Sequence, residues 1–151
     1  VINTQLTGTA VGTGASQVSA GDHTHAGTAE TSGTAQVTTN ETTTSTTYTD
    51  LATAGPAVTL SPGSTQNHLL WYGAYMSMSV TSQEGLMSVA IAGAGASDND
   101  AAGTQNTDPV NSTYFIYATS VTNGSTHTAK YRVTGGTGSF NYRRLVATTT
   151  A

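Results

Sequence analysis

The sequence contains no cysteine, which excludes disulfide bonds and thiolate metal sites. Charged residues are scarce as well: they make up 8% of the 151 residues, whereas about a quarter of an ordinary soluble domain is charged. With a net charge of −4, the chain has little with which to neutralise a run of phosphates, so we expect no nucleic-acid partner. No apolar run approaches the ~20 residues of a membrane-spanning helix, so we expect no membrane insertion.

Aromatic residues are missing from the first part of the chain, before Tyr48. Residues 1–47 are mostly Thr, Gly, Ala and Ser, with few large apolar side chains. Such a segment buries too little apolar surface to offset the backbone entropy of ordering, about 1–2 kcal/mol per residue. We therefore predict that residues 1–47 form an extended arm, which becomes ordered through contacts with other subunits or with a larger particle.

From Tyr48 onward, short apolar runs alternate with turn-forming residues. The runs are residues 57–60, 68–80, 86–92, 113–121, 126–133 and 139–148. Their length and their content of Thr, Val, Tyr and Ile are typical of strands, and no window repeats its apolar residues with the period of a helix. The sequence therefore predicts an all-β chain in which residues 48–151 form an antiparallel β-sandwich, jelly-roll-like, of about six to eight strands.

Aromatic residues gather in two of these runs. Trp71 and Tyr75 have the same parity and would share one face of a strand, with Tyr72 on the other. Exposed aromatic rings stack on sugars, so Trp71 and Tyr75 are candidates for a glycan- or receptor-binding patch. The alternative is a place in the core, which is the commoner position for aromatic side chains. We also expect core positions for Tyr114, Phe115 and Tyr117.

The last two runs, residues 126–133 and 139–148, contain two further features. Phe140 and Tyr142 are two residues apart, which predicts that they lie on one face of a strand. The four cationic residues also lie here: Lys130, Arg132, Arg143 and Arg144. We expect them to pair with acidic residues of the same or an adjoining subunit rather than to bind an anion.

A long stretch without apolar runs separates residues 86–92 from residues 113–121. Its acidic residues, Asp98, Asp100 and Asp108, could supply oxygen ligands to Ca²⁺, but their spacing does not match an EF-hand. We expect a solvated surface loop, or an edge that packs on a neighbouring chain.

The sequence GDHTHAG, residues 21–27, is the one local motif that carries chemistry. His23 and His25 are two residues apart, so both imidazoles project from the same side of an extended backbone. Two nitrogens are weak coordination, but a homotrimer with this segment on its threefold axis would bring six imidazoles together. Six nitrogens suit Fe(II), Ni(II) or Co(II) better than Zn(II). The alternative is a polar loop in which two histidines coincide.

This motif, in its Gly-, Thr- and Ser-rich surroundings, resembles the His-x-His elements of bacteriophage tail fibres. Those fibres are intertwined trimers that bind iron on the threefold axis. Two further segments, TSTTYTDLATAGPAVTL (residues 44–60) and AKYRVTGGTGSFNYRRL (residues 129–145), are similar to small β-sandwich modules of phage virion proteins. The resemblance implies a structural or adhesive role in a virion, and a transition metal such as iron held by His23 and His25.

No catalytic motif accompanies these features, because no nucleophile elbow, phosphate-binding loop or metalloprotease helix occurs in the sequence. We therefore expect a non-enzymatic, homotrimeric tail-fibre or receptor-binding protein of a bacteriophage, located in the virion, an extracellular particle. Its expected partners are copies of itself, other tail or capsid proteins, and a host-surface glycan. The alternatives are a capsid decoration protein or head fibre, and a free carbohydrate-binding module.

Overall fold

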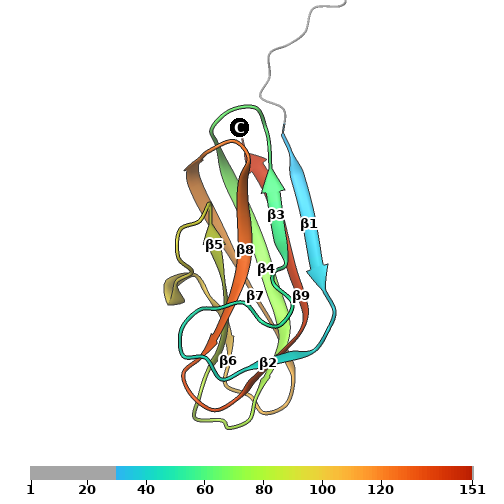
Figure 1. The fold of residues 1–151 in the computed structure, drawn as a ribbon, viewed down its shortest axis with the longest axis vertical. Coiled ribbons are helices and arrows are strands. Elements are labelled where there is room, and N and C mark those ends of the chain that lie inside the picture. Colours follow the sequence, from blue (N-terminus) through green and yellow to red (C-terminus); the bar gives the residue numbers. More distant parts are fainter. Residues whose placement is uncertain (1–29, 151) are drawn as a thin grey trace, which may run out of the picture.

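The structure is a computed structural model that describes residues 30–150. These residues form nine strands and one short 3₁₀ turn. In chain order they are β1 (Ser32–Val37), β2 (Glu41–Thr43), β3 (Ala57–Leu60), β4 (Gln66–Met78), β5 (Gly85–Ile91), η2 (Asp98–Asp100), β6 (Ala102–Thr104), β7 (Val110–Val121), β8 (Ser125–Val133) and β9 (Gly138–Thr150) (Figure 1). The all-β prediction is confirmed for this part of the chain. None of its elements is a helix long and apolar enough to cross a membrane.

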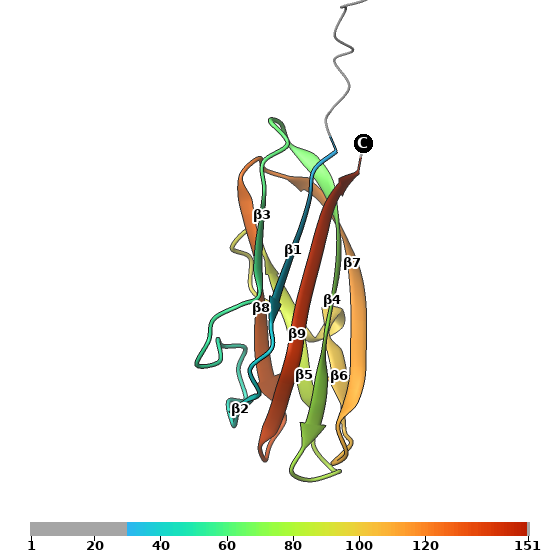
Figure 2. The ribbon, with the colours of Figure 1, turned by 90° about the vertical axis from the view of Figure 1, so that its right-hand side faces the viewer.

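The strands pair into two antiparallel sheets. One has the order β1-β9-β4-β7, with β2 also paired to β9, and the other has the order β3-β8-β5-β6. Figure 2 shows β1, β9, β4 and β7 following one another across the first sheet. Without β2, the first sheet holds the first, eighth, third and sixth strands of the chain, and the second holds the second, seventh, fourth and fifth. This is the strand order of a jelly roll, which is built from two Greek keys.

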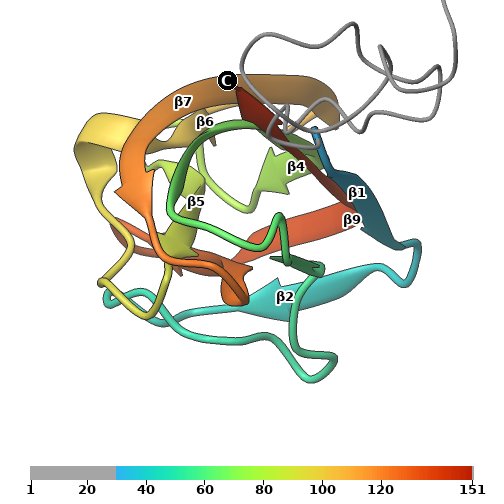
Figure 3. The ribbon, with the colours of Figure 1, turned by 90° about the horizontal axis from the view of Figure 1, so that it is seen from above.

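The core lies between the two sheets, which enclose it in the view along the long axis (Figure 3). Strand β8 shows why the sequence folds this way: Ala129, Tyr131 and Val133 are fully buried, and the residues between them are not. The same alternation fills the core from the strands of both sheets. Its largest apolar members are Leu60, Leu70, Tyr72, Met76, Met87, Tyr131, Phe140 and Leu145.

Part of the predicted arm belongs to the sandwich. Strand β1 pairs with β9 from Ser32 opposite Thr148 to Val37 opposite Arg143, and β2 pairs with the beginning of β9. Hydrogen bonding to β9 orders these residues although they supply little core, since Ala35 alone of β1 packs against the apolar cluster. The sandwich therefore includes residues from Ser32 onward rather than from residue 48.

Strand β9 contains a bulge that changes the direction of its side chains. Gly73 of β4 lies opposite Arg144, but Tyr75 lies opposite Asn141, so Ala74 faces two residues of β9. The extra residue points Tyr142 to solvent while Phe140 stays buried. The prediction that Phe140 and Tyr142 share one face is therefore wrong, because a regular alternation does not continue through a bulge.

Candidate functional site

Exposed apolar side chains gather on the outer surface of the five-stranded sheet. We call this surface the aromatic face, and it consists of Leu69, Trp71, Tyr75, Phe115, Tyr117 and Tyr142. Trp71 of β4 lies directly opposite Phe115 of β7, and Leu69 lies opposite Tyr117. The register therefore brings side chains of β4 and β7 into one continuous apolar surface.

The two candidate binding residues, Trp71 and Tyr75, both lie on this face, with 60% and 37% of their surface exposed. Tyr72 points the other way and is buried, as the parity of the strand predicts. The expectation that Tyr114, Phe115 and Tyr117 of β7 lie in the core is wrong for all three, which are 38%, 71% and 54% exposed. Phe115 and Tyr117 lie opposite Trp71 and Leu69 and therefore point outward with them. Tyr114 lies opposite the buried Tyr72, but β7 is the edge strand of its sheet and leaves Tyr114 partly uncovered.

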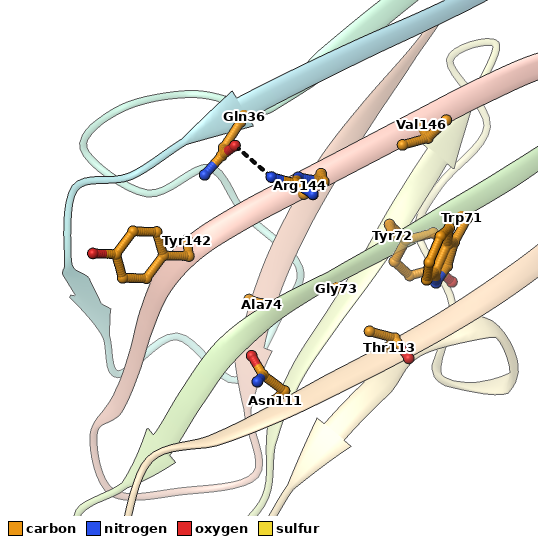
Figure 4. A pocket seen from close by; sticks show the side chains of 10 residues that line it. All are labelled: Gln36, Trp71, Tyr72, Gly73, Ala74, Asn111, Thr113, Tyr142, Arg144 and Val146. Carbon is orange, nitrogen blue, oxygen red and sulfur yellow. Dashed lines mark hydrogen bonds between the residues drawn. The ribbon is translucent and has the colours of Figure 1, made fainter.

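A groove crosses the aromatic face at Gly73 (Figure 4). It has a volume of about 330 Å³, at the lower end of the range for small-molecule sites. Its lining residues are Gln36, Trp71, Tyr72, Gly73, Ala74, Asn111, Thr113, Tyr142, Arg144 and Val146. Figure 4 shows Trp71 and Tyr142 toward opposite ends, with Gln36 and Arg144 along one side and Asn111 and Thr113 along the other.

Gly73 leaves the floor of this groove without a side chain. It lies in the middle of β4, opposite Thr113 on one side and Arg144 on the other. A Cβ atom at this position would collide with the carbonyl oxygen of Ser112 and with the side chain of Thr113. Glycine inside a strand destabilises it, and it is found where a ligand or another backbone comes close.

Tyr142 reaches the groove from a backbone conformation that is unusual for a tyrosine, with φ at +46°. Its amide N–H donates to Oδ1 of Asn141 over 2.8 Å, which supports the bulge. Positive φ costs a residue with a side chain about 1–2 kcal/mol. The fold therefore holds Tyr142 outward at an energetic cost.

Three of the four cations pair with carboxylates, as expected. Lys130 lies 2.8 Å from Asp50, Arg132 pairs with Asp98, and Arg143 lies 2.8 Å from Glu41. The hydrogen bond from Arg132 holds the pKa of Asp98 below its usual value. Within residues 30–150, Asp98 is thus engaged by a cation, and no three acidic or histidine side chains are grouped as a metal would need.

In the Arg143–Glu41 pair, the arginine is buried and the glutamate is partly buried. The Arg143 side chain is inaccessible to solvent, donates to the carbonyl oxygen of Thr53 as well, and lies 5.3 Å from the ring centre of Tyr131. Burial would raise the pKa of Glu41, but hydrogen bonds from Thr53 and the charge of Arg143 outweigh it, so the pKa is lowered. This pair ties β2 and the segment after it to the core.

A buried pair of histidines joins the two sheets, and no pattern in the sequence predicts it. Nδ1 of His68 on β4 lies 2.8 Å from Nε2 of His127 on β8, and neither ring is exposed. Burial, with a smaller contribution from the neighbouring His68, lowers the pKa of His127 to about 4, and burial lowers that of His68. The pair is therefore neutral near pH 7.

The predicted metal ligands His23 and His25 lie outside the described residues. The structure thus places Trp71 and Tyr75 on the same face of the sheet. Trp71 lines the groove together with Gly73, Tyr142 and Arg144, whereas Tyr75 does not line it. No protein-family model matches the sequence, and no curated protein matches it either.

Proposed function

We propose that this protein is a structural component of a bacteriophage virion, a homotrimeric tail-fibre or receptor-binding protein that attaches the particle to a glycan of the host surface. The jelly roll would be its head, and the aromatic face would be the surface that binds. The work of such a protein is adhesive rather than catalytic.

The observation that carries the proposal is the exposure of Trp71 and Phe115 side by side on one sheet. Monomeric soluble proteins rarely expose a contiguous apolar patch larger than a few hundred Å² unless it is a binding site. Rings of this kind stack on the apolar faces of sugars, and the groove beside Trp71 adds amide, hydroxyl and guanidinium groups that can bond to sugar hydroxyls. Jelly rolls also occur in capsid proteins and lectins, which is a fold-level analogy only.

The trimer and its metal are the second part of the proposal. His23 and His25 would bind iron or a similar transition metal on the threefold axis, as the resemblance to tail fibres implies. The residues before β1 would then link the heads to one another and to other virion proteins.

The first test is native mass spectrometry of the full chain, with and without a chelator. We expect a trimer that carries one metal ion and loses it in the His23→Ala variant. A trimer without metal would retain the virion proposal and reduce residues 21–27 to a polar loop. A monomer without metal would overturn the self-standing fibre and favour a capsid decoration protein, whose arm we would expect to resist protease only on the capsid.

The second test measures binding of the full chain to an array of bacterial surface oligosaccharides. We expect binding that falls at least about tenfold in the Trp71→Ala variant, the loss usual for a central aromatic contact. The matched control is Thr126→Ala, an exposed residue of the opposite sheet, which should leave binding unchanged. Saccharide binding by a monomer would favour the free carbohydrate-binding module, and no binding on the array would contradict adhesion through this face.

A further inference from the structure

Arg144 differs from the other three cations of the chain. Its Nη2 donates to Oε1 of Gln36 over 2.9 Å, and among residues 30–150 no carboxylate lies within ion-pairing distance of it. A guanidinium group has five N–H donors, so most of them remain open to water. Arg144 is exposed, and it lies on the side of the groove that faces Asn111 and Thr113.

Arg144 lies along the side of a groove that has an exposed aromatic ring toward each end. Trp71 offers an exposed ring at one end of the groove and Tyr142 another at the opposite end, while Gly73 leaves the floor free of a side chain. Gln36 orients the guanidinium by accepting one of its hydrogen bonds. A sugar ring stacked on Trp71 would thus share the groove with this guanidinium group.

We infer that this groove is a subsite for an acidic sugar, whose carboxylate pairs with Arg144 while its ring stacks on Trp71. This inference rests on the proposed function, because it names the class of glycan that the same face binds. A planar guanidinium matches a carboxylate through two parallel hydrogen bonds, which is the strongest contact the groove can make. The net charge of −4 gives the chain no general attraction for anions, so an acidic ligand must be held by this local contact.

The test compares two ligands of the same shape, an oligosaccharide of uronic acid residues and its fully methyl-esterified form. Binding to the full chain is followed by calorimetry and by the fluorescence of Trp71, the one tryptophan of the sequence. We expect the acid to bind at least about tenfold more tightly than the ester, as for a charge-assisted pair of hydrogen bonds. In the Arg144→Gln variant this preference should disappear, with the affinity for the ester unchanged.

The control variant is Lys130→Gln, which makes the same change of charge on the opposite sheet. Lys130→Gln should leave the preference for the acid intact, because the preference depends on a local contact with Arg144 and not on the net charge of the chain. Arg144→Lys keeps the charge without the planar fork and should retain part of the preference. The thermal unfolding midpoint of each variant shows that the fold is preserved.

The outcomes separate the inference from the proposed function. Equal binding of acid and ester, lost in Trp71→Ala, would overturn the acidic subsite and leave glycan adhesion standing. Binding of a sulfated sugar in preference to the uronate would overturn the carboxylate assignment. If neither ligand binds and Trp71→Ala instead lowers the mass of the native assembly, the face is a contact between copies of the chain, and both the inference and adhesion through this face fail.

Discussion

The two outer surfaces of this sandwich have opposite chemistry. The aromatic face of the five-stranded sheet exposes large rings. The outer surface of the four-stranded sheet instead carries the exposed Thr59 and Thr126 and the partly exposed Thr128, Lys130 and Arg132. On this second surface, which we call the polar face, the hydroxyls of Thr59 and Thr126 lie 2.7 Å apart. Its cations bond to Asp50 and Asp98. Four of the five side chains of the polar face therefore have a polar partner.

The aromatic face has fewer such contacts: Nδ2 of Asn67 donates to the hydroxyl of Tyr117 over 2.9 Å, but the rings of Trp71 and Phe115 remain largely in water. Leaving apolar surface in water forgoes about 25 cal/mol of stabilisation for each Å² that could be buried. The fold does not need these rings, because the core is complete on the other side of the same strands. Their exposure is therefore better explained by a partner than by the stability of the sandwich, and the predictions below test that difference.

The largest effect is expected from the two arginines that follow one another on β9. Arg143→Ala should lower the free energy of unfolding by about 3–5 kcal/mol, because it removes a fully buried side chain and takes the cation away from the partly buried carboxylate of Glu41. Arg144→Ala, on the aromatic face, should change it by no more than about 0.5 kcal/mol. Chemical unfolding measures both. If the two variants lowered the free energy of unfolding equally, this would contradict a bulge that turns Arg143 into the sandwich and Arg144 out of it.

The next effect is expected from acid, through the histidine pair that joins the two sheets. The folded pKa of His127, about 4, is below its ordinary value of 6.5, so the unfolded chain takes up a proton that the folded chain does not. The stabilisation is therefore complete above pH 6.5 and is lost as the pH falls toward 4. The loss should reach about 2–3 kcal/mol near pH 4.5.

Chemical unfolding at a series of pH values from 7 down to 4.5 measures this loss. The series ends at pH 4.5 because this is the ordinary pKa of Glu41, so protonation of Glu41 contributes little to the change. His127→Gln, which keeps a hydrogen-bonding side chain opposite His68, should flatten the profile. A profile that is already flat in the unmodified chain would show that the pair is not neutral in the folded state.

A smaller effect is expected for the fluorescence of Trp71, which unfolding should change only slightly. Because this side chain is 60% exposed, acrylamide should quench its fluorescence in the folded chain almost as strongly as in the unfolded chain. A blue-shifted emission that acrylamide barely quenches would mean that another copy covers the aromatic face in solution. The native mass of the Trp71→Ala variant then identifies that contact.

The smallest effect is expected on the polar face. Lys130→Gln should change the free energy of unfolding by less than about 0.5 kcal/mol, since an exposed ion pair gains little over water. Molar salt should likewise leave the stability nearly unchanged, because few pairs are available to be screened. A loss comparable to that of Arg143→Ala would show that the polar face stabilises the fold as strongly as the buried pair does.

The strands that the sequence predicts are those with strong local patterns. The apolar runs agree with β3, β4, β5, β7, β8 and β9 to within a few residues. Strands β1, β2 and β6 have few apolar residues, and their order comes from pairing with β9 and β5. Such pairing depends on strands that are far away along the chain, so no local sequence pattern predicts it.

The residues of the candidate site also divide into those that the sequence identifies and those that it does not. Trp71 and Tyr75 could be identified because aromatic residues of equal parity stand out in a strand. Arg144 and Gln36 could not, since they come from strands at the two ends of the described chain and meet only through the register of β1 with β9. The role of Gly73 depends on the backbone of β7 beside it.

The sequence by itself determined that this chain is built from strands, and that Trp71 and Tyr72 point in opposite directions. It did not determine which of them faces water. Alternation is a property of one strand, whereas burial depends on which side of that strand a second sheet covers. Only the tertiary structure, by packing β8 and β5 against one side of β4, β7 and β9, made Tyr72 part of the core and left Trp71 and Arg144 in solvent.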